Sequence, residues 1–125
     1  MKPGKTGLAR LFDATAYSMK GLRACFRSEA AFRQELLLVV ALTPLSFWIA
    51  GSTVEWILLI APLALLLIVE LLNSAVEAAI DRIGDEKHVL SGRAKDMGSA
   101  AVLLSLLLIA ITWLPLTWQH FRGTS

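Results

Sequence analysis

The segment "WILLIAPLALLLIVELLNSAVEAAIDR", residues 56–82, joins a long apolar run to a polar one. Its first fourteen residues are all apolar, and its last turns carry Glu70, Asn73, Glu77 and Asp81. A helix needs about 20 mainly apolar residues to cross the hydrocarbon layer of a membrane. Because no water is present there to satisfy the backbone, a spanning segment of this kind must be helical. We therefore predict a membrane-spanning helix over 54–80 with polar groups in its second half.

Two further segments have the same character. "LLLVVALTPLSFWIAG", residues 36–51, reaches the length of a span only by including part of "EAAFRQE", which places this span at about 30–50. The other covers 97–118. The chain has 125 residues, of which 56% are apolar, whereas an ordinary soluble domain has about 45–50%. The sequence predicts one all-α membrane domain over 1–125 with three transmembrane helices.

Residues 7–27 have a different pattern, in which charges interrupt the apolar positions. The apolar face repeats at steps of three and four residues and consists of Leu8, Leu11, Phe12, Thr15, Met19, Leu22 and Phe26. Such a basic amphipathic helix is typical of the membrane surface, where it attracts anionic headgroups. The same interruptions argue against a cleavable signal peptide. The pattern leaves open whether this surface helix only anchors the chain or also contacts a substrate.

The basic residues predict the orientation of the spans. Seven of the twelve Lys and Arg lie within 1–35, and four more lie from Arg82 to Lys95. The positive-inside rule places the N-terminus and the 81–96 loop in the cytoplasm, with the 51–55 turn and the C-terminus outside. The four tryptophans would all mark the outer interface, mainly as anchors; they are Trp48, Trp56, Trp113 and Trp118.

The polar residues of the second span share one helix face, since they recur at steps of three and four. Ionisable groups inside a span normally face a protein interior, a cavity or a partner charge. Contacts between helices through Asn73 and Ser74 are an alternative role, but such contacts do not require carboxylates. Glu70 and Glu77 are about 10 Å apart along the helix, too far to form a pair. Glu77 is placed to meet a metal-bound phosphate from the cytoplasm, and the deeper Glu70 to meet a lipid headgroup.

The loop that follows, "DRIGDEKHVLSGRAKDMGS" at 81–99, mixes carboxylates with basic side chains. Mg²⁺ takes one or two protein carboxylates and leaves its other positions to substrate phosphates and water. Lys and Arg suit phosphate oxygens, and "SGRAKDMGS" leads into a helix N-terminus, which favours anions. Glu29 could complete a metal site with Glu77. Together these features favour phosphoryl transfer.

Four blocks of the sequence carry a family resemblance. They are "YSMKGLRA" at 17–24, "EAAFRQE" at 29–35, "VELLNSAVEAAIDRIG" at 69–84 and "EKHVLSGRAKDMGSAAV" at 86–102. In these blocks the chain resembles bacterial diacylglycerol kinase, a small integral membrane lipid kinase. The resemblance implies MgATP-dependent phosphorylation of 1,2-diacylglycerol to phosphatidate in the bacterial inner membrane, with a cytoplasmic N-terminus and a periplasmic C-terminus. It also implies a homotrimer with its active sites between subunits.

The resemblance also assigns roles to residues. Glu70 would be the catalytic base, Glu29 and Glu77 would hold the Mg²⁺ that accompanies ATP, and Asn73 would support them. The residues expected to bind ATP are Arg10, Tyr17, Glu29, Glu77, Glu86, Lys87, His88, Lys95 and Asp96. Those expected to bind the lipid are Arg10, Arg23, Ala31, Phe32, Arg33, Gln34, Glu35, Glu70, Ser99 and Trp113.

Two other functions stay open at the level of the sequence. An undecaprenol kinase would use the same chemistry on a long isoprenoid alcohol. A non-enzymatic three-span scaffold or channel subunit would use the polar face as a packing seam or a pore. No feature of the sequence suggests a nucleic-acid partner.

Overall fold

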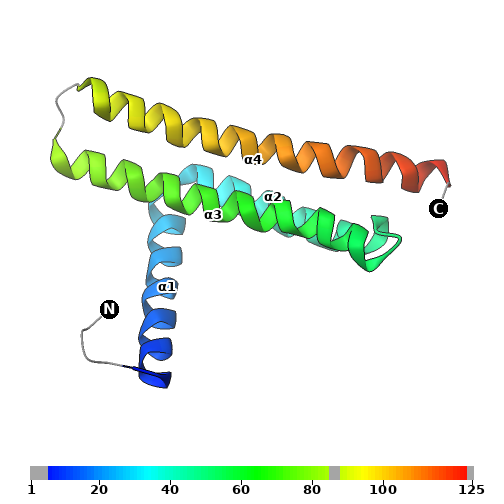
Figure 1. Cartoon of the computed structure of the whole chain (residues 1–125), viewed down its shortest axis with the longest axis horizontal. Helices are drawn as coiled ribbons and strands as arrows, with labels where there is room; N and C mark the ends of the chain where they lie inside the picture. Colours follow the sequence, from blue (N-terminus) through cyan, green and yellow to red (C-terminus); the bar gives the residue numbers. More distant parts are fainter. Residues whose placement is uncertain (1–5, 85–87, 124–125) are drawn as a thin grey trace.

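The computed structural model describes residues 6–84 and 88–123, and these residues form four helices and no strand. The helices are α1 (Leu8–Ser28), α2 (Ala30–Ile49), α3 (Thr53–Ile83) and α4 (Val89–Arg122). Figure 1 shows α2, α3 and α4 side by side as an elongated bundle, while α1 extends sideways from it. The all-α fold is as the sequence predicts.

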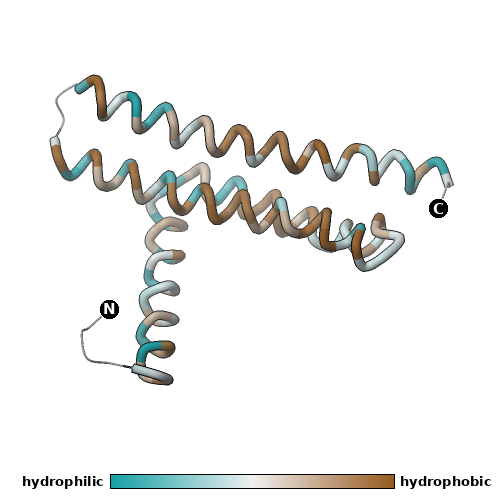
Figure 2. The backbone as a smooth tube through the Cα atoms, viewed as in Figure 1, coloured by the Kyte–Doolittle hydropathy of each residue, from teal (hydrophilic) through white to brown (hydrophobic). Residues whose placement is uncertain are grey.

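Three of the helices are long and apolar enough to cross a membrane, namely α2, α3 and α4. The protein is therefore a multi-pass membrane protein. At 1.5 Å per residue, the 20 residues of α2 extend about 30 Å, which matches the hydrocarbon thickness. The helix reaches this length because it includes most of "EAAFRQE", as predicted. Figure 2 shows apolar residues along much of the bundle and polar ones near the α3–α4 connection.

The segment between α3 and α4 differs from the prediction. The sequence suggested a loop over 81–96 and a third span from 97, but α3 continues to Ile83 and α4 begins at Val89. His88 caps α4, because its Nδ1 accepts a hydrogen bond of 3.0 Å from the backbone N–H of Leu90. Residues 91–99 therefore lie inside α4. From Gly92 onward their backbone N–H groups are used within the helix, so the expectation that a helix begins after "SGRAKDMGS" and leaves its N–H groups for an anion there is wrong.

The turn between α2 and α3 is held by two complementary hydrogen bonds. The side chain of Ser52 accepts a bond of 3.2 Å from the backbone N–H of Glu55. The carboxylate of Glu55 accepts one of 2.8 Å from the backbone N–H of Gly51. This arrangement resembles a capping box, which satisfies N–H groups that have no partner within the helix. The turn allows α3 to run back antiparallel to α2.

The core lies along the contact of α3 with its neighbours. Leu59, Leu63 and Leu66 are almost fully buried, and they repeat at steps of three and four along one face of α3. Ile49, Ile109 and Trp113 complete the cluster from α2 and α4. Because its inner face is packed in this way, α3 holds its polar residues in a fixed direction further along the same helix.

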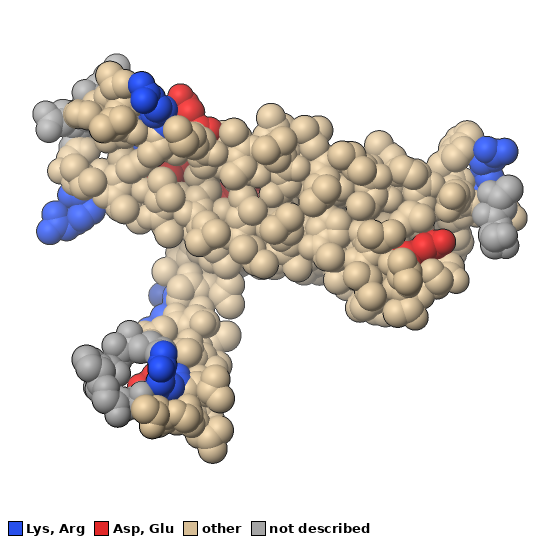
Figure 3. All heavy atoms as spheres, viewed as in Figure 1, with Lys and Arg blue, Asp and Glu red and all other residues tan. Residues whose placement is uncertain are grey.

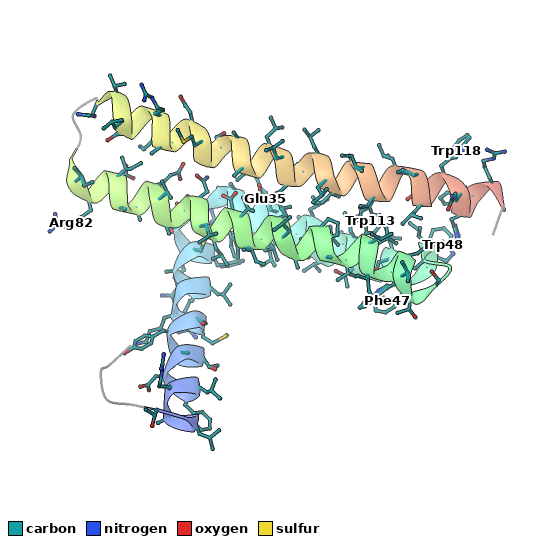
Figure 4. All side chains as sticks on the ribbon, in the orientation of Figure 1. Glu35, Phe47, Trp48, Arg82, Trp113 and Trp118 are labelled. Atoms are coloured by element: carbon teal, nitrogen blue, oxygen red, sulfur yellow. The ribbon has the colours of Figure 1, made fainter. Side chains whose placement is uncertain are left out.

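Trp113 connects α4 to α3 through its indole. Its Nε1 donates a hydrogen bond of 2.9 Å to the backbone carbonyl of Leu59, and the side chain is buried. Leu59 lies three residues before Pro62, and a proline inside a helix disturbs the hydrogen bonds of the preceding turn. The expectation that Trp113 serves as an interfacial anchor is therefore wrong. Trp48 and Trp118 are exposed and lie at the same end of the bundle (Figure 4), as anchors would.

The junction of α1 and α2 is a sharp elbow at Glu29, whose backbone is extended (φ −119°, ψ 110°). Arg33, in the first turn of α2, donates hydrogen bonds of 2.7 and 3.2 Å to the carbonyls of Phe26 and Arg27. A cation at a helix C-terminus satisfies its last carbonyls and complements its dipole. Arg33 thus holds the end of α1 and fixes where Glu29 lies.

Candidate active site

Four glutamates from three segments come together beside α3. Glu70 and Glu77 lie on α3, Glu35 on α2, and Glu29 at the elbow between α1 and α2. The charges of Glu29 and Glu70 both act on Glu77, and Glu70 also acts on Glu35. In Figure 3 the charged side chains gather at the ends of the bundle and on α1, with mostly uncharged residues between them. Glu29 therefore lies close enough to Glu77 for its charge to act there, which is compatible with the suggested pairing of these two residues at a metal.

Glu70 is the most deeply buried of these groups, with 4% of its surface exposed. The carboxyl of Glu35 lies against it, and Glu35 Oε2 is buried with no hydrogen-bond partner among the described residues. The sequence placed Glu35 only along the path of the lipid. Its contact with Glu70 could not be found from the sequence, because it depends on how α2 is rotated against α3.

The donor set for a metal consists of carboxylates. Among the residues that the structure describes, no three His, Cys, Asp or Glu side chains are placed to hold one metal ion. Two carboxylates, those of Glu29 and Glu77, do lie near each other. Mg²⁺ accepts such a pair, because phosphate oxygens and water supply its other ligands. The residues present therefore fit a Mg²⁺ that arrives with a nucleotide.

A positive charge also lies near Glu77. Lys95 on α4 forms an ion pair with Asp81 at 3.1 Å, and the two side chains are 45% and 69% exposed. The charge of Lys95 also acts on Glu77. Exposed ion pairs of this kind are weak, so Lys95 is free to exchange Asp81 for a phosphate oxygen. Carboxylates and an exposed ammonium group at one end of α3 suit a bound polyphosphate.

Asn73 lies between the levels of Glu70 and Glu77 and faces α4. Its Oδ1 is buried without a hydrogen-bond partner in the described part of the chain. A Cβ added at Gly98 would overlap this oxygen, so the absence of a side chain there lets Asn73 approach the α4 backbone. Both residues line a mostly apolar cavity of 380 Å³ between α3 and α4. The predicted supporting role of Asn73 is compatible with this position.

Cys25 is the residue through which the end of α1 contacts α3 beside the carboxylates. Its thiol is buried and lies 3.5 Å from the hydroxyl of Ser74 on α3. Burial raises the pKa of the Cys25 thiol above its usual value, the hydrogen bond with Ser74 acts in the opposite direction, and the negative charge of Glu29 adds to the increase. The small residues around this contact leave a groove of 280 Å³. The end of α1 thus packs closely against α3. This packing holds Glu29, the residue at the elbow, near the carboxylates of α3.

The other predicted site residues are less concentrated. Those on α1 are exposed and lie along a helix that leads away from the bundle; they are Arg10, Tyr17 and Arg23. Ala31 and Gln34 on α2 are exposed, as are Asp96 and Ser99 on α4. Phe32 and Trp113 are buried, with 3% and 7% of their surfaces exposed. Glu86 and Lys87 lie outside the described residues. The roles of all these residues in binding stay predictions.

Comparison with known proteins connects this arrangement to a family. The prokaryotic diacylglycerol kinase family matches residues 16–117. The chain belongs to this family. It is 50% identical to the diacylglycerol kinase of Escherichia coli (strain K12) over 97% of this chain and 99% of that protein. It is 54% identical to the diacylglycerol kinase of Pseudomonas aeruginosa over 88% and 89% of the two chains. The diacylglycerol kinase of Helicobacter pylori (strain ATCC 700392 / 26695) is 42% identical over 89% and 87%.

Membership in the prokaryotic diacylglycerol kinase family confirms the resemblance that the sequence blocks suggested. The matched region includes Glu29, Glu35, Glu70, Glu77 and Lys95, which are the groups that the structure brings together. The carboxylate cluster and the family therefore indicate the same class of membrane enzyme.

Proposed function

We propose that this protein transfers the γ-phosphate of MgATP to the hydroxyl of 1,2-diacylglycerol and so forms phosphatidate. The observation that carries the proposal is the meeting of Glu29, Glu70 and Glu77 beside Lys95 on a membrane-spanning helix. A kinase that acts on a lipid needs acidic groups at two depths, one for the water-borne nucleotide and one for the membrane alcohol. The names of its relatives support diacylglycerol as the alcohol.

The depths of Glu77 and Glu70 in the membrane support separate sites for the nucleotide and for the lipid. If Trp56 marks the outer interface, the roughly 20 residues of a span end near Val76. Glu77 then lies at the inner boundary of the hydrocarbon layer, where a nucleotide can arrive from the cytoplasm. Glu70 lies seven residues, or about 10 Å, deeper. A diacylglycerol hydroxyl can approach it from within the leaflet.

The chemistry follows from these positions. Phosphoryl transfer depends chiefly on alignment of the reactants and on neutralisation of charge. Glu29 and Glu77 would hold the magnesium ion, which, when bound, neutralises phosphate charge. Lys95 would leave Asp81 and bind a phosphate oxygen. Glu70 would accept the proton of the lipid hydroxyl as this oxygen attacks the γ-phosphorus.

We also propose that the active enzyme is a homotrimer with sites between subunits, set in the inner membrane with its N-terminus in the cytoplasm. One chain supplies the carboxylates, but most of α1 extends away from them (Figure 1). The exposed Arg10 and Tyr17 would therefore reach a nucleotide or lipid held by a neighbouring subunit. The exposed apolar residues of α1, such as Leu8, Phe12 and Met19, support its expected place at the membrane surface.

The test is transfer of labelled γ-phosphate from MgATP in mixed micelles that contain diacylglycerol, with undecaprenol in a parallel reaction. Labelled phosphatidate is the expected product. Label in undecaprenol alone would keep the mechanism and change the substrate. No label in either reaction would refute the kinase and favour a three-span scaffold.

A further inference from the structure

Arg33 closes the elbow between α1 and α2, a role that the proposed mechanism does not yet use. Only Glu29 separates the two helices. The last turn of a helix leaves carbonyl groups that have no partner inside the helix. At the end of α1, the carbonyl of Cys25 accepts a hydrogen bond of 2.9 Å from the N–H of Glu29. The next two carbonyls, those of Phe26 and Arg27, accept bonds of 2.7 and 3.2 Å from Arg33 Nη1, so one side chain of α2 binds both of them.

The backbone of Arg33 is also bonded to the elbow. Its N–H donates a hydrogen bond of 3.3 Å to the carbonyl of Glu29. Glu29 has an extended backbone (φ −119°, ψ 110°), which turns the chain sharply between the two helices. The direction in which α1 leaves the bundle, and with it the place of the Glu29 side chain, therefore depends on the bonds that Arg33 makes.

The elbow lies against the part of α3 that carries Glu77. Glu29 lines a groove of 280 Å³ together with residues that include Ser74 and Ala78 of α3, which come just before and just after Glu77 in the chain. Ser74 also contacts the thiol of Cys25 on α1 at 3.5 Å. A thiol is only a weak hydrogen-bond donor. The stronger restraint on the elbow is therefore the pair of bonds from the charged guanidinium of α2.

A metal site made of these carboxylates needs such a restraint. Glu29 and Glu77 come from different segments, and two carboxylates repel each other until a cation lies between them. A site whose ligands are held in place beforehand binds more tightly than one whose ligands must be ordered on binding. Partners that orient a metal ligand typically contribute about 10–100-fold to metal affinity.

We propose that Arg33 is a positioning residue for the metal pair: by binding the last carbonyls of α1, it holds the carboxylate of Glu29 beside Glu77 and so sets the affinity for the Mg²⁺ that arrives with the nucleotide. This inference rests on the proposed kinase function. The family resemblance instead implies that Arg33 binds the lipid. The two roles differ in which reactant is affected when the guanidinium is removed.

The first test measures how phosphatidate formation depends on free Mg²⁺ and on diacylglycerol in Arg33→Gln, with Arg27→Gln as the matched control. Both changes remove an exposed positive charge near the elbow, but the Arg27 side chain has no hydrogen bond or ion pair among the described residues. Arg33→Gln should raise the Mg²⁺ concentration for half-maximal rate about tenfold, because the bonds it removes are exposed and the lower end of the range applies.

Saturating Mg²⁺ should restore most of the rate of Arg33→Gln, and the KM for diacylglycerol should stay that of the parent. Arg27→Gln should keep the parental value of both constants. A raised KM for diacylglycerol with an unchanged Mg²⁺ requirement in Arg33→Gln would overturn the positioning role and favour a contact with the lipid.

Two further measurements do not depend on turnover. Binding of Mn²⁺ in the presence of a non-hydrolysable ATP analogue, followed by electron paramagnetic resonance, should be about tenfold weaker in Arg33→Gln and unchanged in Arg27→Gln. Hydrogen exchange of the backbone over residues 25–33 should be faster in Arg33→Gln, while parental exchange in α3 and α4 shows that the bundle is folded. Parental Mn²⁺ affinity or parental exchange at the elbow would overturn the role of Arg33.

These outcomes are distinguishable from failure of the kinase proposal. If the parent makes phosphatidate and Arg33→Gln binds Mn²⁺ as the parent does, only the role of Arg33 fails. If the parent makes no phosphatidate, the kinase proposal fails, and this inference fails with it.

Discussion

The approach of α3 to α4 at Gly98 gives the sharpest prediction for stability. A Cβ at this position would overlap Asn73 Oδ1 and lie 3.0 Å from Asn73 Cγ. Gly98→Ala must therefore displace the Asn73 side chain or move the helices apart. Overpacking of this kind costs about 1–3 kcal/mol, while alanine in place of glycine inside a helix contributes about 1 kcal/mol in the opposite direction.

Gly92 provides a matched control on the same helix, because a Cβ there meets nothing within 4 Å. Gly92→Ala should show only the gain in helix propensity. The unfolding free energy of Gly98→Ala should therefore be lower than that of Gly92→Ala by about 1–3 kcal/mol. Unfolding in mixed micelles with increasing sodium dodecyl sulfate, followed by circular dichroism, measures this difference.

A double-mutant cycle identifies the cause. In an Asn73→Ala background the oxygen is absent, so Gly98→Ala should become as favourable as Gly92→Ala. The coupling between positions 73 and 98 isolates their mutual contact from the separate effect of each change. If Gly98→Ala and Gly92→Ala are equally stable when Asn73 is present, the close approach of the two helices is wrong.

Three further predictions concern the core, the elbow and the active site. Trp113→Phe removes the indole hydrogen bond between α4 and α3 and should lower the unfolding free energy by about 0.5–2 kcal/mol, whereas the exposed Trp118→Phe should change it little. Because burial raises the pKa of the Cys25 thiol, less thiolate is present at neutral pH, and a maleimide should label the folded protein much more slowly than the chain unfolded in detergent; equal rates would contradict the burial. Glu77→Gln should lose affinity for MgATP in equilibrium binding, while Glu70→Gln should bind MgATP but turn over about 10²–10⁴-fold more slowly. Unchanged nucleotide affinity in Glu77→Gln would refute its role at the metal.

The α3–α4 connection shows where local pattern fails. The charged composition of residues 81–96 predicts a loop, because loops between spans are usually charged. The same composition includes Arg, Ala and Lys, which are good helix formers, and His88 supplies a cap. Hydropathy indicates where a helix leaves the membrane, but it does not indicate where the helix ends. Trp113 is a similar case, since its place near the C-terminal end of α4 predicts an anchor, whereas the structure buries it and its indole bonds to the backbone of Leu59.

The sequence alone predicts the all-α fold, the three membrane-crossing helices and the polar face of α3. These features depend on hydrophobic length and helical periodicity, which are local properties of the chain. It also named Glu29, Glu70 and Glu77, through the resemblance of the blocks that contain them. Three contacts appear only once the helices are packed: Glu35 against Glu70, Arg33 against the last carbonyls of α1, and Asn73 against Gly98. These contacts depend on the rotation and separation of packed helices, which are set by the whole core and not by any one segment of the chain.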